Sequence, residues 1–138
     1  MPLSRFETFI DEHHILTLAT SKDNIPQCAT LFYAYDALHV SFIVASDSKT
    51  EHIQNLMNNK HVAGTIALET KSIGKIQGIQ FQAEMILSDN SEDKRLYFKA
   101  FPYALAMNPT LWKIKISNMK LTDNRLGFGT KLTWEALE

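Results

Sequence analysis

The residues most suited to chemistry lie in the segment 45–52, where an apolar run gives way to a polar one. Three hydroxyl groups and one ammonium group follow one another there, on Ser46, Ser48, Lys49 and Thr50. A helix is expected to begin in this segment, and the unpaired N–H groups and the macrodipole of a helix start favour an anion such as a phosphate. Glu51 would repel a phosphate placed close to it, and Ser48 and Glu51 also form a Ser-x-x-Glu capping box. The segment therefore predicts either a phosphate site or an ordinary capped helix.

A second candidate surface lies on a segment with the alternation of a β-strand, in which Gln80, Gln82 and Glu84 separate apolar residues. Inside a barrel, the two neutral amides would hydrogen bond to the carbonyl groups and ring nitrogens of a heteroaromatic ligand. An exposed sheet face has the same pattern, and exposure is the simpler expectation. Trp112 and Trp134 are likewise more often core residues than stacking platforms.

Several common catalytic and metal-binding patterns are absent from the sequence. It contains neither Gly-x-Gly-x-x-Gly nor a P-loop, and its single cysteine, Cys28, has no partner for an internal disulfide. We expect Cys28 to be a small core residue. The histidines are His13, His14, His39, His52 and His61. None has the spacing of a metal ligand on one element, so no metal site is predicted and no catalytic side chain is assigned.

Composition excludes other classes of partner. Lys and Arg number 14 and Asp and Glu number 15, which gives a net charge of −1 and argues against a nucleic acid or an anionic membrane as the main partner. No segment approaches the roughly 18 apolar residues of a membrane span, and the N-terminus lacks a signal-peptide pattern. We therefore expect a cytoplasmic protein whose residues 1–138 form a single domain.

The hydrophobic pattern predicts many strands and few helices. Strands are expected over 14–20, 27–35, 38–45, 62–68 and 79–87, from 112 to a turn at 122–124, and in a last segment ending at Trp134. Helices are expected over 4–13, 48–58 and 91–101, the first two begun by the capping boxes Ser4–Glu7 and Ser48–Glu51. Consecutive strands are joined by tight turns, and helices do not alternate with strands. The pattern therefore favours a mainly β (α+β) protein with a closed or nearly closed antiparallel sheet over a doubly wound one.

Six motifs connect these segments to a known family. They are the Ser-x-Ser-Lys-Thr helix start at 46–50, Val-Ala-Gly-Thr-Ile-Ala at 62–67, Ile-Gln-Gly-Ile-Gln-Phe-Gln-Ala-Glu at 76–84, Phe-Pro-Tyr-Ala at 101–104, Leu-Trp-Lys-Ile at 111–114, and the segment 120–134. In this order, over nearly the whole chain, the sequence resembles the pyridoxamine 5′-phosphate oxidase-like split-barrel flavoproteins, and within them the small YhbP-like group. The resemblance implies a six- to seven-stranded antiparallel split β-barrel with short flanking helices.

The resemblance also implies a function and a site. It implies a homodimer with two FMN sites at the subunit interface, and hence an FMN-binding oxidoreductase that acts on an unidentified small molecule. The positions that match the family's site are Ala29, Thr30 and Leu31 for the flavin ring, Ser46, Ser48, Lys49 and Thr50 for the phosphate, Gln80 on a strand that lines the site, and Trp112 and Lys131 from the neighbouring subunit.

Two positions depart from the family pattern. Ala29 stands where many members have an arginine for the phosphate, and Glu51 stands where closer relatives often have a basic residue, so Lys49 is the only cation of the turn. A pyridoxal-forming oxidase is not expected, because the chain lacks the C-terminal Arg-Leu-His-type segment of that activity. Two alternatives stay open. One is a non-catalytic binding module for a phosphorylated cofactor. The other is a haem-binding or haem-degrading split-barrel protein, whose iron would need an axial ligand among His13, His14, His39 and His52.

Overall fold

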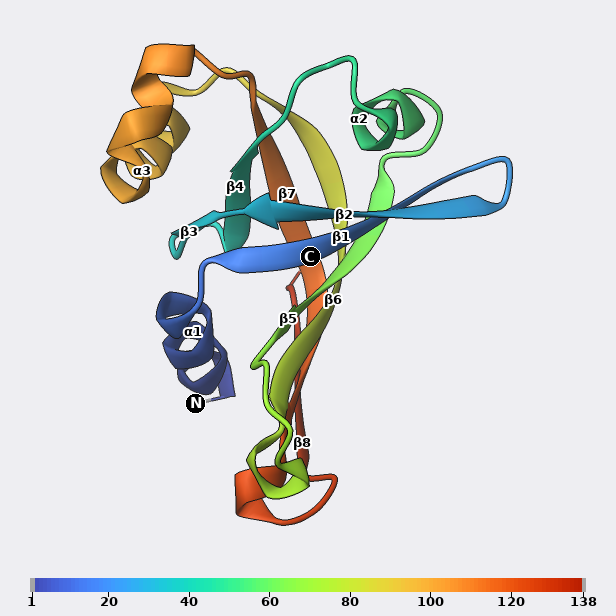
Figure 1. Ribbon diagram of the computed structural model, residues 1–138, viewed down its shortest axis with the longest axis vertical. Coiled ribbons are helices and arrows are strands. Elements are labelled where there is room, and N and C mark those ends of the chain that lie inside the picture. Colours follow the sequence, from blue (N-terminus) through green and yellow to red (C-terminus); the bar gives the residue numbers. More distant parts are fainter. Residues whose placement is uncertain (1, 138) are drawn as a thin grey trace.

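The computed structural model describes residues 2–137, whose eight strands form one antiparallel sheet (Figure 1). The strands are β1 (Ile15–Lys22), β2 (Ile25–Phe32), β3 (Ala34–Asp36), β4 (Ser41–Ala45), β5 (His61–Ala67), β6 (Gln77–Ser88), β7 (Leu111–Asp123) and β8 (Lys131–Glu135). Their order is β2-β1-β5-β6-β7-β4-β3, and β8 also pairs with β7.

The long strand β7 gives the sheet its shape. One edge of β7 pairs with β6 along its whole length. The other edge is shared, because β4 pairs with residues 111–115 and β8 pairs with residues 118–122. The sheet curls so that β2, at its far end, packs across β4 without pairing with it (Figure 1). The result is a curled antiparallel half-barrel, and the expectation of a split barrel is confirmed.

Six short helices flank the sheet within the described residues. The α-helices are α1 (Pro2–Glu12), α2 (Glu51–Leu56) and α3 (Ser91–Ala100), and the 3₁₀ helices are η1 (Ile73–Lys75), η2 (Pro102–Met107) and η3 (Asn124–Leu126). In Figure 1, α2 lies at one end of the long strands, whereas η1 and η3 lie against each other at the opposite end. We call that opposite end, residues 71–76 and 124–130, the tip. None of the described helices is long and apolar enough to cross a bilayer.

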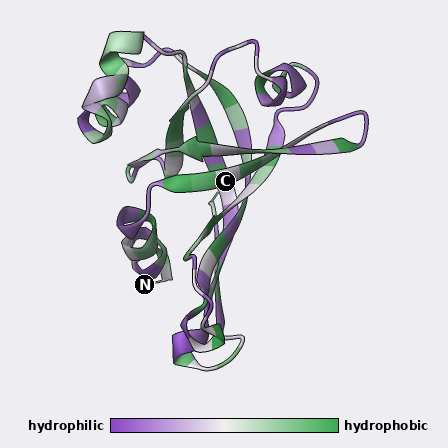
Figure 2. Cartoon of the chain, viewed as in Figure 1, coloured by the Kyte–Doolittle hydropathy of each residue, from purple (hydrophilic) through white to green (hydrophobic). Residues whose placement is uncertain are grey.

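Alternating burial along the strands builds the core. On β6, Ile79, Phe81 and Met85 are buried, whereas Gln80 and Gln82 are exposed. Figure 2 shows hydrophobic and hydrophilic bands alternating along the long strands. The predicted period of two is therefore confirmed from Ile79 to Met85, because successive side chains of a strand point to opposite faces.

Two strand boundaries differ from the expectation. The predicted strand over 27–35 is divided at Tyr33 into β2 and β3. The hydroxyl of Tyr33 donates to the carbonyl oxygen of Ile10 in α1 at 2.6 Å. The predicted strand over 38–45 begins only at Ser41. The residues before Ser41 form a turn in which Asp36 Oδ1 accepts two backbone N–H groups.

Both predicted capping boxes are wrong. α1 begins at Pro2, a residue suited to the first turn of a helix, so Ser4 lies inside the helix. The Glu7 carboxylate instead accepts a tyrosine hydroxyl from β3 at 2.6 Å. α2 begins at Glu51 with Thr50 as its N-cap residue, so the helix starts two residues later than a Ser48 cap requires.

A buried ion-pair network fixes α3 on the sheet. Lys113 Nζ, on β7, lies 3.1 Å from Asp36 Oδ2 and 3.3 Å from Asp93 Oδ1 of α3. Ser88 also donates to Asp93, at 2.7 Å. Buried charges are tolerated when they are paired in this way. Figure 1 shows α2 apart from α3, and the candidate site lies where the end of β4 leads to α2.

Candidate functional site

The turn formed by residues 46–50 connects β4 to α2 and is organised by its own polar groups. Asp47 Oδ1 accepts the backbone N–H of Lys49 at 2.8 Å, and the Asp47 carbonyl oxygen accepts the hydroxyl of Thr50 at 2.8 Å. The side chains of Ser48 and Lys49 are exposed. The Ser48 hydroxyl and the Lys49 ammonium group therefore reach solvent, whereas Ser46 and Thr50 are half-buried, and the hydrogen bonds of Asp47 order the backbone of the turn.

His52 supports the turn from inside. Its side chain is buried, and its Nε2 atom lies 2.5 Å from Ser46 Oγ and 3.3 Å from Thr50 Oγ1. Burial lowers the pKa of His52, which favours the neutral imidazole. A neutral imidazole carries one proton, so Nε2 either accepts from the Ser46 hydroxyl or donates to its oxygen, according to the tautomer, and Ser46 is the nearer of the two hydroxyl groups.

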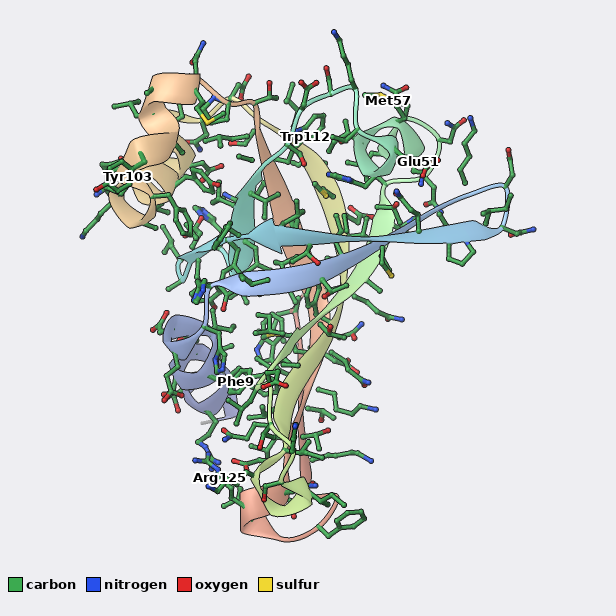
Figure 3. The ribbon with its side chains drawn as sticks, in the orientation of Figure 1. Phe9, Glu51, Met57, Tyr103, Trp112 and Arg125 are labelled. Atoms are coloured by element: carbon green, nitrogen blue, oxygen red, sulfur yellow. The ribbon has the colours of Figure 1, made fainter. Side chains whose placement is uncertain are left out.

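Trp112 fixes the turn from the sheet. Its indole Nε1–H donates to the carbonyl oxygen of Ser46 at 3.0 Å, across 66 positions of the sequence. The backbone N–H of Ser46 donates to Thr110 at 3.0 Å. Figure 3 shows Trp112 near the turn, at the end of β7 that is close to α2. Trp112 is thus a core residue that positions the turn of its own subunit.

The charges of the turn are mixed. Lys49 is exposed, and no carboxylate of the described residues forms an ion pair with it. Asp47 and Glu51 are also exposed and carry the opposite charge. A phosphate fits the exposed Ser48 hydroxyl and the Lys49 ammonium group, and these two carboxylates oppose it. The turn can therefore hold an anion, with Lys49 as its one local cation.

The strand β2 brings its residues 29–31 to the edge of the sheet. β1 is its only partner among the described strands, so alternate peptide groups at its other edge have no sheet partner. Thr30 is exposed, whereas Ala29 and Leu31 are half-buried on the core side. β2 packs against both β4 and α2, which brings this free edge to the side of the molecule that carries the turn (Figure 1).

The face of the sheet that points away from the core is exposed along six strands, and we call it the outer face. Cross-strand pairing aligns one row of side chains on it, Thr30, Thr17, Thr65, Gln80, Lys120 and Thr133. A neighbouring row consists of Cys28, Ala19, Ala63, Gln82, Asn118 and Glu135. All of these except Thr30 line a groove of about 580 Å³. Small and uncharged side chains dominate this surface.

The predicted site residues do not all meet within one chain. Gln80 lies on the outer face, and Lys131 lies beyond it, opposite Thr122 near the tip. Thr122 and Trp112 are ten residues apart on β7, which corresponds to about 33 Å of strand. Lys131 and the turn therefore lie at opposite ends of the molecule.

The structure also shows where Cys28 and the candidate histidines lie. The expectation that Cys28 is a core residue is wrong, because it is exposed on the outer face, where β2 presents every second side chain to solvent. His13 bonds a carbonyl oxygen of α1, and His39 bonds Asp36. His14 is exposed and stacks on Phe32 with a centroid distance of 5.8 Å. No group of three or more metal-binding side chains occurs within residues 2–137.

The sequence did not reveal the structural roles of Asp47, in the turn, and of His52, in α2. Asp47 orders the backbone of the turn, and His52 bonds its first hydroxyl. The six-residue spacing of Ser46 and His52 follows neither helical nor strand periodicity, so no sequence pattern indicated the contact.

Comparisons of structure support the fold. The chain is similar to a heme binding protein from Mycobacterium smegmatis, with a TM-score of 0.80 and 12% identity over 98% of this chain and 58% of that one. It is similar to a NimC/NimA family protein from Clostridium acetobutylicum, with a TM-score of 0.72 and 17% identity over 98% and 92% of the two chains. A FAD-binding protein from Mesorhizobium loti gives a TM-score of 0.71 and 13% identity over 86% and 90%.

Comparisons of sequence are more specific. No family model matches the chain. Among curated proteins, it is 36% identical over 129 residues to a UPF0306 protein from Serratia proteamaculans, which covers 91% of this chain and 90% of the relative. It is 33% identical over 135 residues to the UPF0306 protein YhbP from Salmonella arizonae, which covers 96% and 92%. The chain therefore belongs to the UPF0306 family of YhbP-like proteins.

Proposed function

We propose that this protein is an FMN-binding flavoprotein, an oxidoreductase that holds its flavin at the interface of a homodimer. The observation that carries the proposal is the packing of β2 against β4 and α2, which brings the free edge of the sheet to the side of the polar turn. One edge offers backbone groups to a planar ring, and the turn offers a cation and hydroxyls to a phosphate. The FAD-binding protein of similar fold supports a flavin as the ligand class.

The turn would hold the phosphate of FMN. Lys49 would supply the charge, and the exposed Ser48 hydroxyl would donate a hydrogen bond. The Thr50 hydroxyl donates to the Asp47 carbonyl oxygen and would have to turn away from it to reach the phosphate. The Ser46 hydroxyl would donate to the phosphate in the tautomer in which His52 Nε2 donates to Ser46 Oγ. Asp47 and Glu51 would lower the affinity of the turn for the phosphate, because both carboxylates repel it.

The free edge of β2 would hold the ring. Between Ala29 and Leu31, unpaired peptide groups can donate to and accept from the polar edge of an isoalloxazine. The flavin supplies the redox chemistry when it is bound, and the side chains around it orient it and exclude water. No side chain of the described site is required as a nucleophile.

The outer face would bind the second subunit. A surface of threonines, alanines and neutral amides across six strands carries little charge that would have to be desolvated. Gln80 lies on this face, and Lys131 lies at one end of the same strands. In a dimer built on this face, both residues would approach the partner's flavin, while each Trp112 would support the turn of its own subunit.

Haem is the second candidate ligand, because a heme binding protein shares the fold. Among the four candidate axial histidines, His52 uses its Nε2 atom to bond Ser46, whereas His39 and His13 form their hydrogen bonds through Nδ1 and keep Nε2 for an iron. His14 is exposed as well. The hydrogen bonds of the histidines therefore do not separate the two ligands, and the polar turn, which fits a phosphate, favours the flavin.

A titration of the purified protein with FMN and with riboflavin tests the proposal. FMN should bind at about one per chain and quench its fluorescence, and Lys49→Ala should weaken FMN binding about tenfold, or about 1.4 kcal/mol. Riboflavin lacks the phosphate, so the same substitution should leave its affinity unchanged. Lys94→Ala, an exposed lysine on α3, is the matched control.

Three other results would contradict the proposal. If FMN and riboflavin bound equally well, the turn would not hold the phosphate. A Soret band after addition of haem, with no flavin binding, would assign the site to haem. If the bound flavin were not reduced by NADH or NADPH, the protein would be a binding module for the flavin and not an oxidoreductase that uses these donors.

A further inference from the structure

The two ring nitrogens of His52 lie in different surroundings. Nε2 faces the turn, 2.5 Å from Ser46 Oγ and 3.3 Å from Thr50 Oγ1. Nδ1 forms no hydrogen bond within residues 2–137, and the one buried polar side-chain atom without a partner in that part of the chain is Gln27 Oε1. Nδ1 therefore keeps contact with solvent, although the side chain as a whole is buried. The ring can exchange a proton with water through Nδ1 while Nε2 stays bonded to the turn.

The turn that His52 supports is short of positive charge. Lys49 is its one cation, whereas Asp47 and Glu51 each carry a negative charge. A phosphate ester adds about 1.5 to 2 negative charges at neutral pH. Figure 3 shows Glu51, the sequence neighbour of His52, at the same end of the molecule as Trp112, which holds the turn. An occupied turn therefore needs a second cation.

The elements packed against α2 do not provide this cation. α2 packs against β1 and β2, and its own charged residue is Glu51. The titratable residues of the two strands are Lys22, which is exposed at the end of β1, and Cys28, which points to the outer face. His52 is thus the group beside the turn that can gain a positive charge between pH 8 and pH 6.

A bound phosphate would favour the protonated ring. A phosphate oxygen bonded to the Ser46 hydroxyl would lie about 5 Å from His52 Nε2, the length of two hydrogen bonds in series. A negative charge at this distance stabilises an imidazolium, both of whose nitrogens are donors. Nε2 then donates to Ser46 Oγ, which leaves the hydrogen of Ser46 free for the phosphate. In the free protein, burial lowers the pKa of His52 and keeps the ring neutral at pH 7.

We infer that His52 is a proton-coupled positioning residue, which takes up a proton from solvent when a phosphate binds to the turn and becomes the second cation there. This inference rests on the proposed function. Because the bound state then holds more protons than the free state, affinity for a phosphorylated ligand rises as the pH falls from 8 to 6. A ligand without a phosphate does not show this dependence.

Fluorescence titrations at pH 6, 7 and 8, in buffers without phosphate, test the inference. The wild-type protein should bind FMN about three- to tenfold more tightly at pH 6 than at pH 8. His52→Gln keeps an amide that can bond Ser46 but cannot titrate, so its FMN affinity should not rise at pH 6. It should even fall slightly there, because FMN loses part of its own charge near pH 6. His61→Gln, which changes an exposed histidine, is the matched control and should keep the wild-type profile.

An NMR titration of the wild-type protein gives a readout that does not depend on the folding of a variant. The imidazole resonances of isotope-labelled protein are assigned and followed against pH, alone and saturated with FMN or with riboflavin. FMN should raise the pKa of His52, and riboflavin, which lacks the phosphate, should not change it.

The other outcomes separate the two proposals. If FMN affinity depends on pH in the same way in the wild-type protein and in His52→Gln, His52 is only a structural support and the inference is wrong, while the flavin site stands. A pKa of His52 that FMN leaves unchanged would likewise overturn the inference alone. If the wild-type protein binds no FMN at any of the three pH values, the proposed function fails, and the inference fails with it.

Discussion

At the scale of single residues, Asp123 shows how a buried carboxylate can stabilise the base of the tip. Its side chain is buried at the end of β7 and accepts hydrogen bonds from Arg125 Nε at 3.0 Å and Nη2 at 2.9 Å, while Arg5 lies 3.5 Å away. The hydrogen bonds from Arg125 lower the pKa of Asp123 below its usual value of 3.8. The ion pair is therefore formed at neutral pH and holds η3 in place.

Asp123→Asn should reduce the free energy of unfolding at pH 7 by about 1 kcal/mol, a modest value because water screens the half-exposed guanidinium. A carboxylate with a lowered pKa stabilises the fold above the unfolded value of 3.8, and this contribution is lost as the pH falls through the folded value. In urea unfolding, the stabilities of the wild-type protein and the variant should therefore converge as the pH is lowered from 7 through the folded pKa of Asp123, which lies below 3.8.

Asp89→Asn is the control for that measurement, since Asp89 is exposed and has no ion pair with a described residue. It should change stability little at either pH. An equal loss for Asp123→Asn at both pH values would show that packing, and not charge, is what the carboxylate contributes.

At the scale of elements, the strands follow their hydrophobic pattern and the helix starts do not. Alternation decides which face of a strand is buried, and burial of that face dominates the energy of the sheet. A capping box is a pattern of two residues worth about 1 kcal/mol, so Pro2 and Thr50 can begin the helices elsewhere.

Close contact between β5 and its neighbours makes Gly64 a sensitive position. A Cβ atom there would lie 2.3 Å from Phe81 Cζ and 2.5 Å from the backbone oxygen of Thr17. The ring can shift, but the backbone of β1 cannot move without disturbing the ladder. Gly64→Ala should therefore lower the free energy of unfolding by about 1–3 kcal/mol in urea denaturation.

Gly74→Ala is the matched control, because nothing lies within 4 Å of a Cβ atom at that position of the tip. Its stability should equal that of the wild-type protein or exceed it slightly. Equal stabilities of the two variants would mean that β1 and β5 are not packed as closely as described.

At the scale of the whole molecule, the outer face of the sheet takes no part in the hydrophobic core, and in the proposed dimer it would form the interface. Thr65 lies in the middle of this face, between Thr17 and Gln80 in the cross-strand row. In the proposed dimer, Thr65→Arg would bury a charge without a partner, at a cost of about 3 kcal/mol or more for each subunit. Sedimentation should therefore show monomers for Thr65→Arg and dimers for the wild-type protein.

Thr8→Arg places the same charge on the exposed side of α1 and should leave the dimer intact. FMN affinity should fall together with dimerisation in Thr65→Arg, because the partner's Gln80 and Lys131 would then be absent from the proposed site. If the Thr65→Arg protein remained dimeric, the dimer interface would lie on another surface and not on the outer face.

The sequence by itself determined the local properties of this protein. The alternation of Ile79, Phe81 and Met85 with glutamines determined a one-sided strand, and the order of strand patterns and tight turns determined an antiparallel sheet. The polar turn at 46–50 was likewise visible as a run of hydroxyl groups beside Lys49. These properties depend on residues that are close together in the chain, so short patterns are sufficient to reveal them.

Only the tertiary structure decided which of these parts meet. It joined Trp112 to Ser46 across 66 positions, bonded His52 to the first hydroxyl of the turn, and put Lys131 at the far end of β7. Such contacts arise from strand register and from the curl of the sheet, which depend on the packing of all strands at once. The physical reason is that a contact between distant residues forms only when several elements pack together, and its stability depends on all of them. No single segment of the sequence therefore carries the information that predicts the contact.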